Sequence, residues 1–187
     1  MAITISGSGI TSANIADGTI VNADVADVAA SKLTGALPAL DGSALTGVGK
    51  VLQIVQGTTS TSVANSTNVY ADTGLTATIT PTSTTSKILV VYHQNGGYVD
   101  ATSSNNGLKI RLIRDVTAIE TLDTPVGWNL KFQQIYLPTI SSSYLDSPST
   151  TTATTYYTQF RNNANNASVY VQIQSCPSTI TLMEIGV

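Results

Sequence analysis

The sequence contains little charge. Of its 187 residues only 10% are charged, and eight lysines and arginines against eleven aspartates and glutamates give a net charge of −3. Soluble proteins are on average about one quarter charged. The cations cluster only at Lys109, Arg111 and Arg114, and in a strand Lys109 and Arg111 would share one solvated face. Because no basic surface is indicated, the sequence argues against nucleic acid as a partner.

Histidine and cysteine each occur once. A metal site with two or three imidazole ligands is therefore excluded within one chain. A serine–histidine–aspartate triad would depend on His93, and no GxSxG motif presents a serine, so we interpret His93 as structural. The single Cys176 excludes an intramolecular disulfide framework. Its position before Pro177, at the end of an expected strand, favours a small buried thiol.

Motifs for catalysis and metal binding are also missing. No glycine-rich loop fits a phosphate and no DxDxDG loop fits calcium, and we interpret Asp17, Asp24 and Asp27 as solvated exterior positions. Two acids of the later region could meet as a glycosidase pair, but none lies in an aromatic-lined motif that would raise its pKa. These acids are Asp72, Asp100, Asp115, Glu120, Asp123, Asp146 and Glu184. The sequence therefore predicts no catalytic residue, no cofactor and no metal, and a protein that is not an enzyme.

Long apolar segments are absent as well. No run approaches the roughly 20 residues that a membrane helix needs. The opening MAITISGSGI lacks the charged start and the long apolar core of a secretion signal. We expect no membrane insertion and no export by the general pathway.

The first 50 residues carry a repeat with a period of five. Apolar residues recur at positions 5, 10, 15, 20 and 25, and ANIAD (13–17) returns as ADVAD (23–27). This period suits neither a helix nor a strand. Short fixed repeats are typical of one small unit stacked along an axis.

A single copy of this repeat would be marginally stable. Ordering each residue costs roughly 1–2 kcal/mol, whereas one buried Ile or Val in every five returns only about 1.5–3 kcal/mol. Three copies around a common axis would bury each apolar row against two equivalents. We therefore predict a homotrimeric β stalk and neck over residues 13–50, with a disordered low-complexity segment as the alternative. Its core would be formed by Ile15, Ile20, Val25, Leu33 and Leu37.

Residues 1–12 precede the stalk. Ile3 and Ile5 alternate with small residues, and Ile10 follows. Such a segment could add a strand to the sheet of a partner, which makes it a candidate attachment segment, or it could be a frayed terminus.

Residues 51–187 have the pattern of an all-β domain. Eight to ten short alternating segments recur about every ten residues without a helical pattern, which predicts an antiparallel β-sandwich or jelly roll. Expected loops cover 95–107, 124–129 and 141–153. In them lie Tyr98, Trp128 and Tyr144, our candidate receptor-binding residues, because exposed aromatic rings suit both sugars and protein surfaces. The alternative is that they fill the end of the sandwich or a subunit seam, and for Trp128 both interpretations stay open.

Two groups of segments resemble a known family. ITSANIADGTIVNADV and SKLTGALPALDGSALTGV resemble the stalks of tailed-bacteriophage fibre proteins. KVLQIVQG, DTGLTATITPTSTTSKILVVY, SYLDSPSTTTATTYYTQFR and STITLMEIGV are similar to the C-terminal knob of fibres from marine and cyanobacterial phages. The resemblance implies a homotrimer with an intertwined shaft, a β-sandwich head and host-surface binding without chemistry.

These patterns lead to one expected function and one alternative. The expected protein is a structural virion fibre that binds a host-surface glycan or protein through its knob. The stalk begins almost at Met1, where long tail fibres have a large anchoring domain, so a short fibre or a capsid decoration fits better. The alternative is a decoration or cement protein that stabilises the capsid shell. Either would be assembled in the host cytoplasm and located on the tail, collar or capsid of the virion, attached to other virion structural proteins through residues 1–12.

Overall fold

The computed structural model describes residues 50–100, 106–128, 135–165 and 167–186, and for Lys50 and 123–128 it describes the backbone alone. The predicted attachment segment 1–12 with Ile3, Ile5 and Ile10 lies outside the described residues. So does the predicted stalk with Ile15, Ile20, Val25, Leu33 and Leu37.

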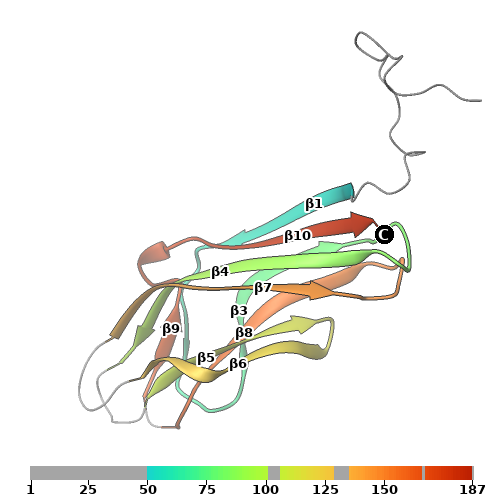
Figure 1. Ribbon diagram of the computed structural model, residues 1–187. Coiled ribbons are helices and arrows are strands. Elements are labelled where there is room, and N and C mark those ends of the chain that lie inside the picture. Colours follow the sequence, from blue (N-terminus) through green and yellow to red (C-terminus); the bar gives the residue numbers. More distant parts are fainter. Residues whose placement is uncertain (1–49, 101–105, 129–134, 166, 187) are drawn as a thin grey trace, which may run out of the picture. The chain divides into compact units, whose positions relative to one another are not determined.

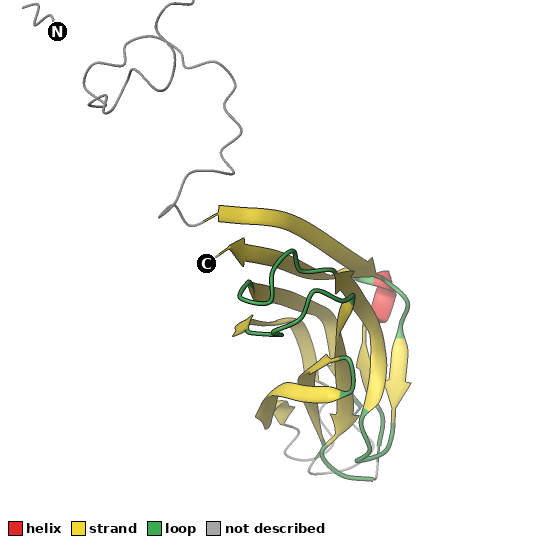
Figure 2. Ribbon diagram, turned by 90° about the vertical axis from the view of Figure 1, so that its right-hand side faces the viewer, coloured by secondary structure: helices red, strands yellow, loops and turns green. Residues whose placement is uncertain are grey.

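The described residues form ten strands in two antiparallel sheets, which confirms the all-β prediction. Sheet A has the order β1-β10-β4-β9-β2, with β7 along the other edge of β4, and sheet B has the order β3-β8-β5-β6 (Figure 1). The strands are β1 (Lys50–Thr59), β2 (Val63–Asn65), β3 (Ala71–Ile79), β4 (Lys87–Val99), β5 (Gly107–Arg114), β6 (Thr117–Trp128), β7 (Ile135–Asp146), β8 (Thr154–Asn162), β9 (Val169–Val171) and β10 (Ser178–Gly186). One 3-10 helix, Ile173–Ser175, precedes β10 and is drawn red in Figure 2.

Alternating burial builds the core. Along β3, β8 and β10 every second side chain is buried, as expected for strands with one face against a core. The buried residues of both sheets form one hydrophobic cluster, and fully burying each large side chain contributes about 1.5–3 kcal/mol. Its largest members are Tyr92, Tyr156, Phe160, Leu75, Ile79, Ile88, Leu108, Ile110, Leu112, Ile180 and Leu182.

Strands extend into all three segments that we expected to be loops. β4 continues to Val99, β6 to Trp128 and β7 to Asp146. The placement of the candidate residues Tyr98, Trp128 and Tyr144 in loops is therefore wrong. Their Gly-, Asn- and Ser-rich surroundings have low strand propensity, but β4 and β7 pair along their length, and this pairing overrides the local preference.

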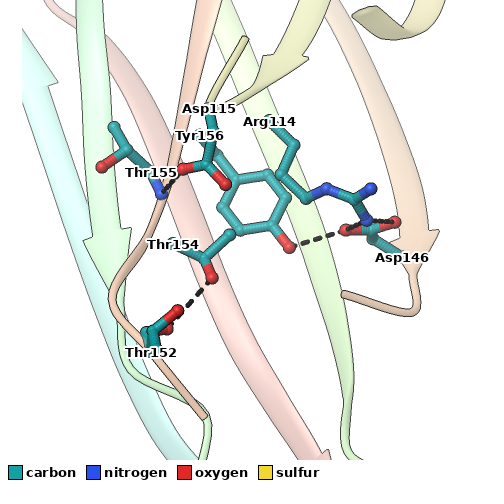
Figure 3. Close-up of polar contacts among 7 residues, drawn as sticks. All are labelled: Arg114, Asp115, Asp146, Thr152, Thr154, Thr155 and Tyr156. Atoms are coloured by element: carbon teal, nitrogen blue, oxygen red, sulfur yellow. Dashed lines mark hydrogen bonds and ion pairs between the residues drawn. The ribbon is translucent and has the colours of Figure 1, made fainter. Parts of the chain in front are cut away.

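A partly buried ion pair joins the ends of β5 and β7 (Figure 3). Arg114 Nη1 donates to both carboxylate oxygens of Asp146 at 2.9 and 2.8 Å, and the Tyr156 hydroxyl donates to Oδ2 at 2.7 Å. Burial, followed by the hydrogen bond to Asp146, raises the pKa of Tyr156, so its hydroxyl remains a donor. These contacts join β5, β7 and β8 across the two sheets.

Other acids from the glycosidase search also have structural partners. Glu120 accepts from the hydroxyls of Tyr92 at 3.1 Å and Ser142 at 2.7 Å. Asp115, at a turn with φ of 52°, accepts from the Thr155 N–H at 2.9 Å. Glu120 thus links β6 of sheet B to β4 and β7 of sheet A, and Asp115 links the turn between β5 and β6 to β8.

Candidate ligand-binding site

Three tyrosines form a row on the outer face of sheet A. Tyr98 of β4 lies opposite Tyr136 of β7 on one side and opposite Tyr170 of β9 on the other. The ring centroid of Tyr98 is 5.0 Å from that of Tyr136 and 5.5 Å from that of Tyr170, at interplanar angles of 43° and 48°. Tyr136 is 62% exposed and the other two rings are half-buried. We call this row the tyrosine strip.

Two glycines direct Tyr98 to the outer face. Strict alternation along β4 would place Tyr98 on the buried face with Gln94, yet Val99 is the buried residue. Gly96 has a φ of 60°, and the side-chain direction changes there. A Cβ on Gly96 would lie 2.8 Å from the Ile173 nitrogen, and one on Gly97 would lie 2.9 Å from the Leu137 Cβ. A side chain at either position would therefore disturb the strip.

A shallow pocket adjoins the tyrosine strip. It has a volume of about 240 Å³, and Tyr136 belongs to both the strip and the pocket wall. Most of its exposed lining is apolar. The lining residues are Gly96, Gly97, Tyr136, Leu137, Pro138, Ile173, Gln174 and Cys176. Cys176 is thus half-buried at a pocket wall, whereas we expected a buried thiol.

The wall of this pocket opposite β4 is a strained segment. Gln172, Gln174 and Ser175 have φ values of 52°, 55° and 57°, which non-glycine residues adopt at a cost of roughly 1–3 kcal/mol each. The Gln172 N–H donates to the Asn95 carbonyl at 2.9 Å, and the Cys176 N–H donates to the Ile173 carbonyl at 3.1 Å. Such strain is concentrated at binding sites, where the surrounding structure holds the backbone in place.

A buried polar network supports this segment from inside. Gln94 is fully buried, donates to Ser178 Oγ at 3.0 Å and accepts from the Thr158 hydroxyl at 3.0 Å. Thr158 in turn shares a 2.6 Å hydrogen bond with the Thr73 hydroxyl. The network extends from sheet A to sheet B and keeps β4 in register beneath the strip.

The strip can bind a ligand without covalent chemistry. Burial, and then the charge of Asp100, raise the pKa of Tyr98, so the phenol stays protonated. Three outward rings present flat apolar area edged by hydroxyl groups. This combination suits the apolar face of a sugar ring, whose hydroxyl groups can exchange hydrogen bonds with the phenols.

Only one of the three predicted site residues belongs to the tyrosine strip. Tyr98 is its centre. Tyr144 packs half-buried against the core from β7, and Trp128 pairs with Gly107 at the end of β6, with its side chain outside the described part. Sequence reasoning missed Tyr136 and Tyr170, because only the strand register shows that they flank Tyr98.

A second hollow offers less to a ligand. It measures about 330 Å³ and lies beside Arg114 and Asp115, with several threonines in its lining (Figure 3). Thr150 and Thr152 share a 3.0 Å hydrogen bond, and the Thr154 hydroxyl donates to the Thr152 carbonyl at 3.1 Å. Because these groups are already paired within the protein, the tyrosine strip is the stronger candidate.

No protein-family model matches the chain, and no curated protein matches its sequence closely enough to be a relative. In the described ranges no group of three or more His, Cys, Asp or Glu side chains is arranged to hold a metal ion. No helix in the same ranges is both long and apolar enough to cross a membrane.

Proposed function

We propose that residues 51–187 form the binding head of a tailed-phage fibre and that the tyrosine strip binds a glycan of the host surface. The observation that carries the binding role is the junction of the strip with the 240 Å³ pocket at Tyr136. The resemblance of the sequence to phage fibre knobs supports the proposal that the protein is part of a virion. Weak sugar contacts become firm attachment when several heads act together.

A homotrimer would supply several heads, and the outer face of sheet A supports such an assembly. Ile54, Met183, Leu89 and Leu145 lie directly opposite one another across β1, β10, β4 and β7. The terminal members of this apolar row, Ile54 and Leu145, are 61% and 53% exposed. Exposed apolar rows of this kind mark protein contacts. The repeat segment that we predict to trimerise leads directly into β1, so a second copy of the chain is the occupant we propose for the row.

The test compares cell binding by full-length variants. Tyr98→Ala with Tyr136→Ala should reduce binding to host cells by about tenfold or more, because each ring removed eliminates a stacking surface. Tyr136→Phe keeps the ring and should retain most of the binding. The control is Val116→Ala, because Val116 is 93% exposed on a turn of sheet B.

Unchanged binding by the double variant, with wild-type thermal stability, would remove the strip from receptor binding. The decoration role would then take precedence, because the apolar row of sheet A also suits a fixed contact with capsid subunits. In that case, particles without the protein should break more readily on heating than complete particles.

A further inference from the structure

Three of the eight lysines and arginines lie together on the outer face of sheet B, although the protein has a net charge of −3. Lys109 and Arg111 belong to β5 and Arg161 to β8, and Lys109 lies directly opposite Arg161 in the strand register. Like charges in this arrangement destabilise a sheet. The sequence alone indicated a solvated face for Lys109 and Arg111, and the fold adds Arg161 to it.

Tyr70 holds the two guanidinium groups of this cluster. The Cζ atom of Arg111 is 3.9 Å from the centre of the Tyr70 ring, and that of Arg161 is 5.0 Å from it. Both distances are within the range of cation–π attraction. We call Tyr70, Lys109, Arg111 and Arg161 the cationic cluster.

The hydrogen bonds of the arginines in the cluster go to neutral acceptors. Arg111 donates twice to Gln159 Oε1, at 2.9 and 2.6 Å, and Arg161 donates to the Asn68 carbonyl at 3.1 Å. Both acceptors are neutral. The nearby Asp72 instead accepts from Gln159 Nε2 at 2.7 Å. Within the described ranges the ion pair found is Arg114–Asp146, so these cations have no carboxylate partner there.

Two buried polar atoms of the cluster also lack a partner. Neither the Tyr70 hydroxyl nor Arg161 Nε forms a hydrogen bond within the described part of the chain. Buried polar groups of folded proteins are nearly always paired, so such exceptions require an explanation. Here the exceptions adjoin three cations that have no direct carboxylate partner among the described residues.

A pocket on the same face lies next to the cluster. Between Asp72 and Thr76 the register of β3 with β8 is irregular, and Gly74 has a φ of 82°. The resulting pocket of about 240 Å³ is lined by Asp72, Gly74, Leu75, Thr76 and Tyr157. Tyr157 lies on the same face of β8 as Gln159 and Arg161, so the pocket and the cluster share that strand. Bulges of this type often adjoin binding sites.

We propose that this face binds an anionic polysaccharide. Its carboxylate or sulfate groups would contact the half-buried side chains of Lys109, Arg111 and Arg161, and its sugar rings would extend along β8 toward Tyr157. The proposal rests on the proposed function in one respect, namely that the head meets surface polymers. The face lies on the sheet opposite the tyrosine strip, so the two sites can be tested separately.

The experiment measures binding of the full-length protein to dextran sulfate and to neutral dextran of equal length, at low and high salt. The unchanged protein should bind dextran sulfate only, and more weakly as salt rises, because neutralised anionic groups release counterions. Lys109→Gln with Arg161→Gln should weaken binding about tenfold or more and flatten the salt dependence. Lys109→Arg with Arg161→Lys should bind nearly as well as wild type.

The matched control is Lys87→Gln, which removes an exposed cation from sheet A and should leave binding unchanged. Removing the facing like charges should not lower thermal stability, which separates loss of binding from loss of fold. Equal affinity of wild type and the Lys109/Arg161 glutamine variant would overturn the proposal. Competition by single-stranded DNA as strong as that by dextran sulfate would also overturn the proposal, because the site would then recognise negative charge alone and not a sugar polymer. The Tyr98/Tyr136 alanine variant should keep dextran sulfate binding. A negative result for glycan binding by the tyrosine strip can therefore be distinguished from a negative result for the cationic cluster.

Discussion

Gln53 and Glu184 join the edge strand β1 to β10 by a 2.6 Å hydrogen bond from Nε2 to Oε2. Gln53 Nε2 also donates to the Thr80 carbonyl at 2.7 Å, beyond the end of β3 in sheet B. Thr82 completes the site, because its N–H and its hydroxyl each donate to Glu184 Oε1 at 2.7 Å. A fully buried carboxylate thus holds β1 in place next to the exposed apolar row.

The fold should lose stability in acid through Glu184. Burial alone would raise the pKa of this carboxyl group, but hydrogen bonds, led by that from Gln53, lower it to about 2. A lowered pKa means that the stabilisation is complete above the unfolded value of about 4.5 and is lost as the pH falls through about 2. The contribution at pH 7 is on the order of 3 kcal/mol. Urea unfolding between pH 7 and pH 2 measures it.

Glu184→Gln provides the comparison. This variant should be less stable than wild type at pH 7, and the difference should vanish near pH 2. Asp72→Asn removes an exposed carboxylate and should leave the pH profile close to that of wild type. A constant difference between Glu184→Gln and wild type at every pH would show that the lowered pKa of Glu184 does not stabilise the fold.

Gly96 and Gly74 form a matched pair of positions. Both have positive φ, and substitution by alanine at either costs about 1–2 kcal/mol for that conformation. At Gly74 the new Cβ would have its nearest contact at 3.7 Å, whereas at Gly96 it would lie 2.8 Å from the Ile173 nitrogen. Gly96→Ala should therefore destabilise the protein by more than about 3 kcal/mol in urea unfolding, and clearly more than Gly74→Ala. Equal losses of stability for the two variants would mean that the pocket wall at Ile173 moves to accommodate the new Cβ at little cost in free energy.

The apolar row of sheet A should contribute to self-association. Light scattering on a sizing column would give the mass of the full chain, which is about three times 19.4 kDa for a trimer. Ile54→Glu with Leu145→Glu places two charges in the proposed seam and should lower this mass. Thr58→Glu, which is exposed on the same face of β1, is the control. A trimeric mass for the Ile54/Leu145 variant would exclude the row as the seam, and a monomeric wild type would exclude the trimer itself.

The strands of the core were predictable from the sequence. The segments that became β8 and β10 were predicted as strands, and burial alternates along both with a period of two. Around Gly96 the same rule fails. Alternation would place Tyr98 with Gln94 and Tyr136 with Ile140 on the buried face. In β4 the alternation of buried and outward side chains changes phase at Gly96, and in the paired strand β7 it changes phase as well. Both tyrosines therefore point outward.

The amino-acid sequence by itself determined that this part of the chain is all β, because local alternation and low helix propensity act within each segment. Only the tertiary structure decided which side chains meet. Tyr98 joins Tyr136 and Tyr170, and Lys109 faces Arg161, through pairings between strands that are distant in the chain. The register of such pairings depends on the packing of the whole core and on the turn at Gly96. The two proposed binding surfaces follow from that register.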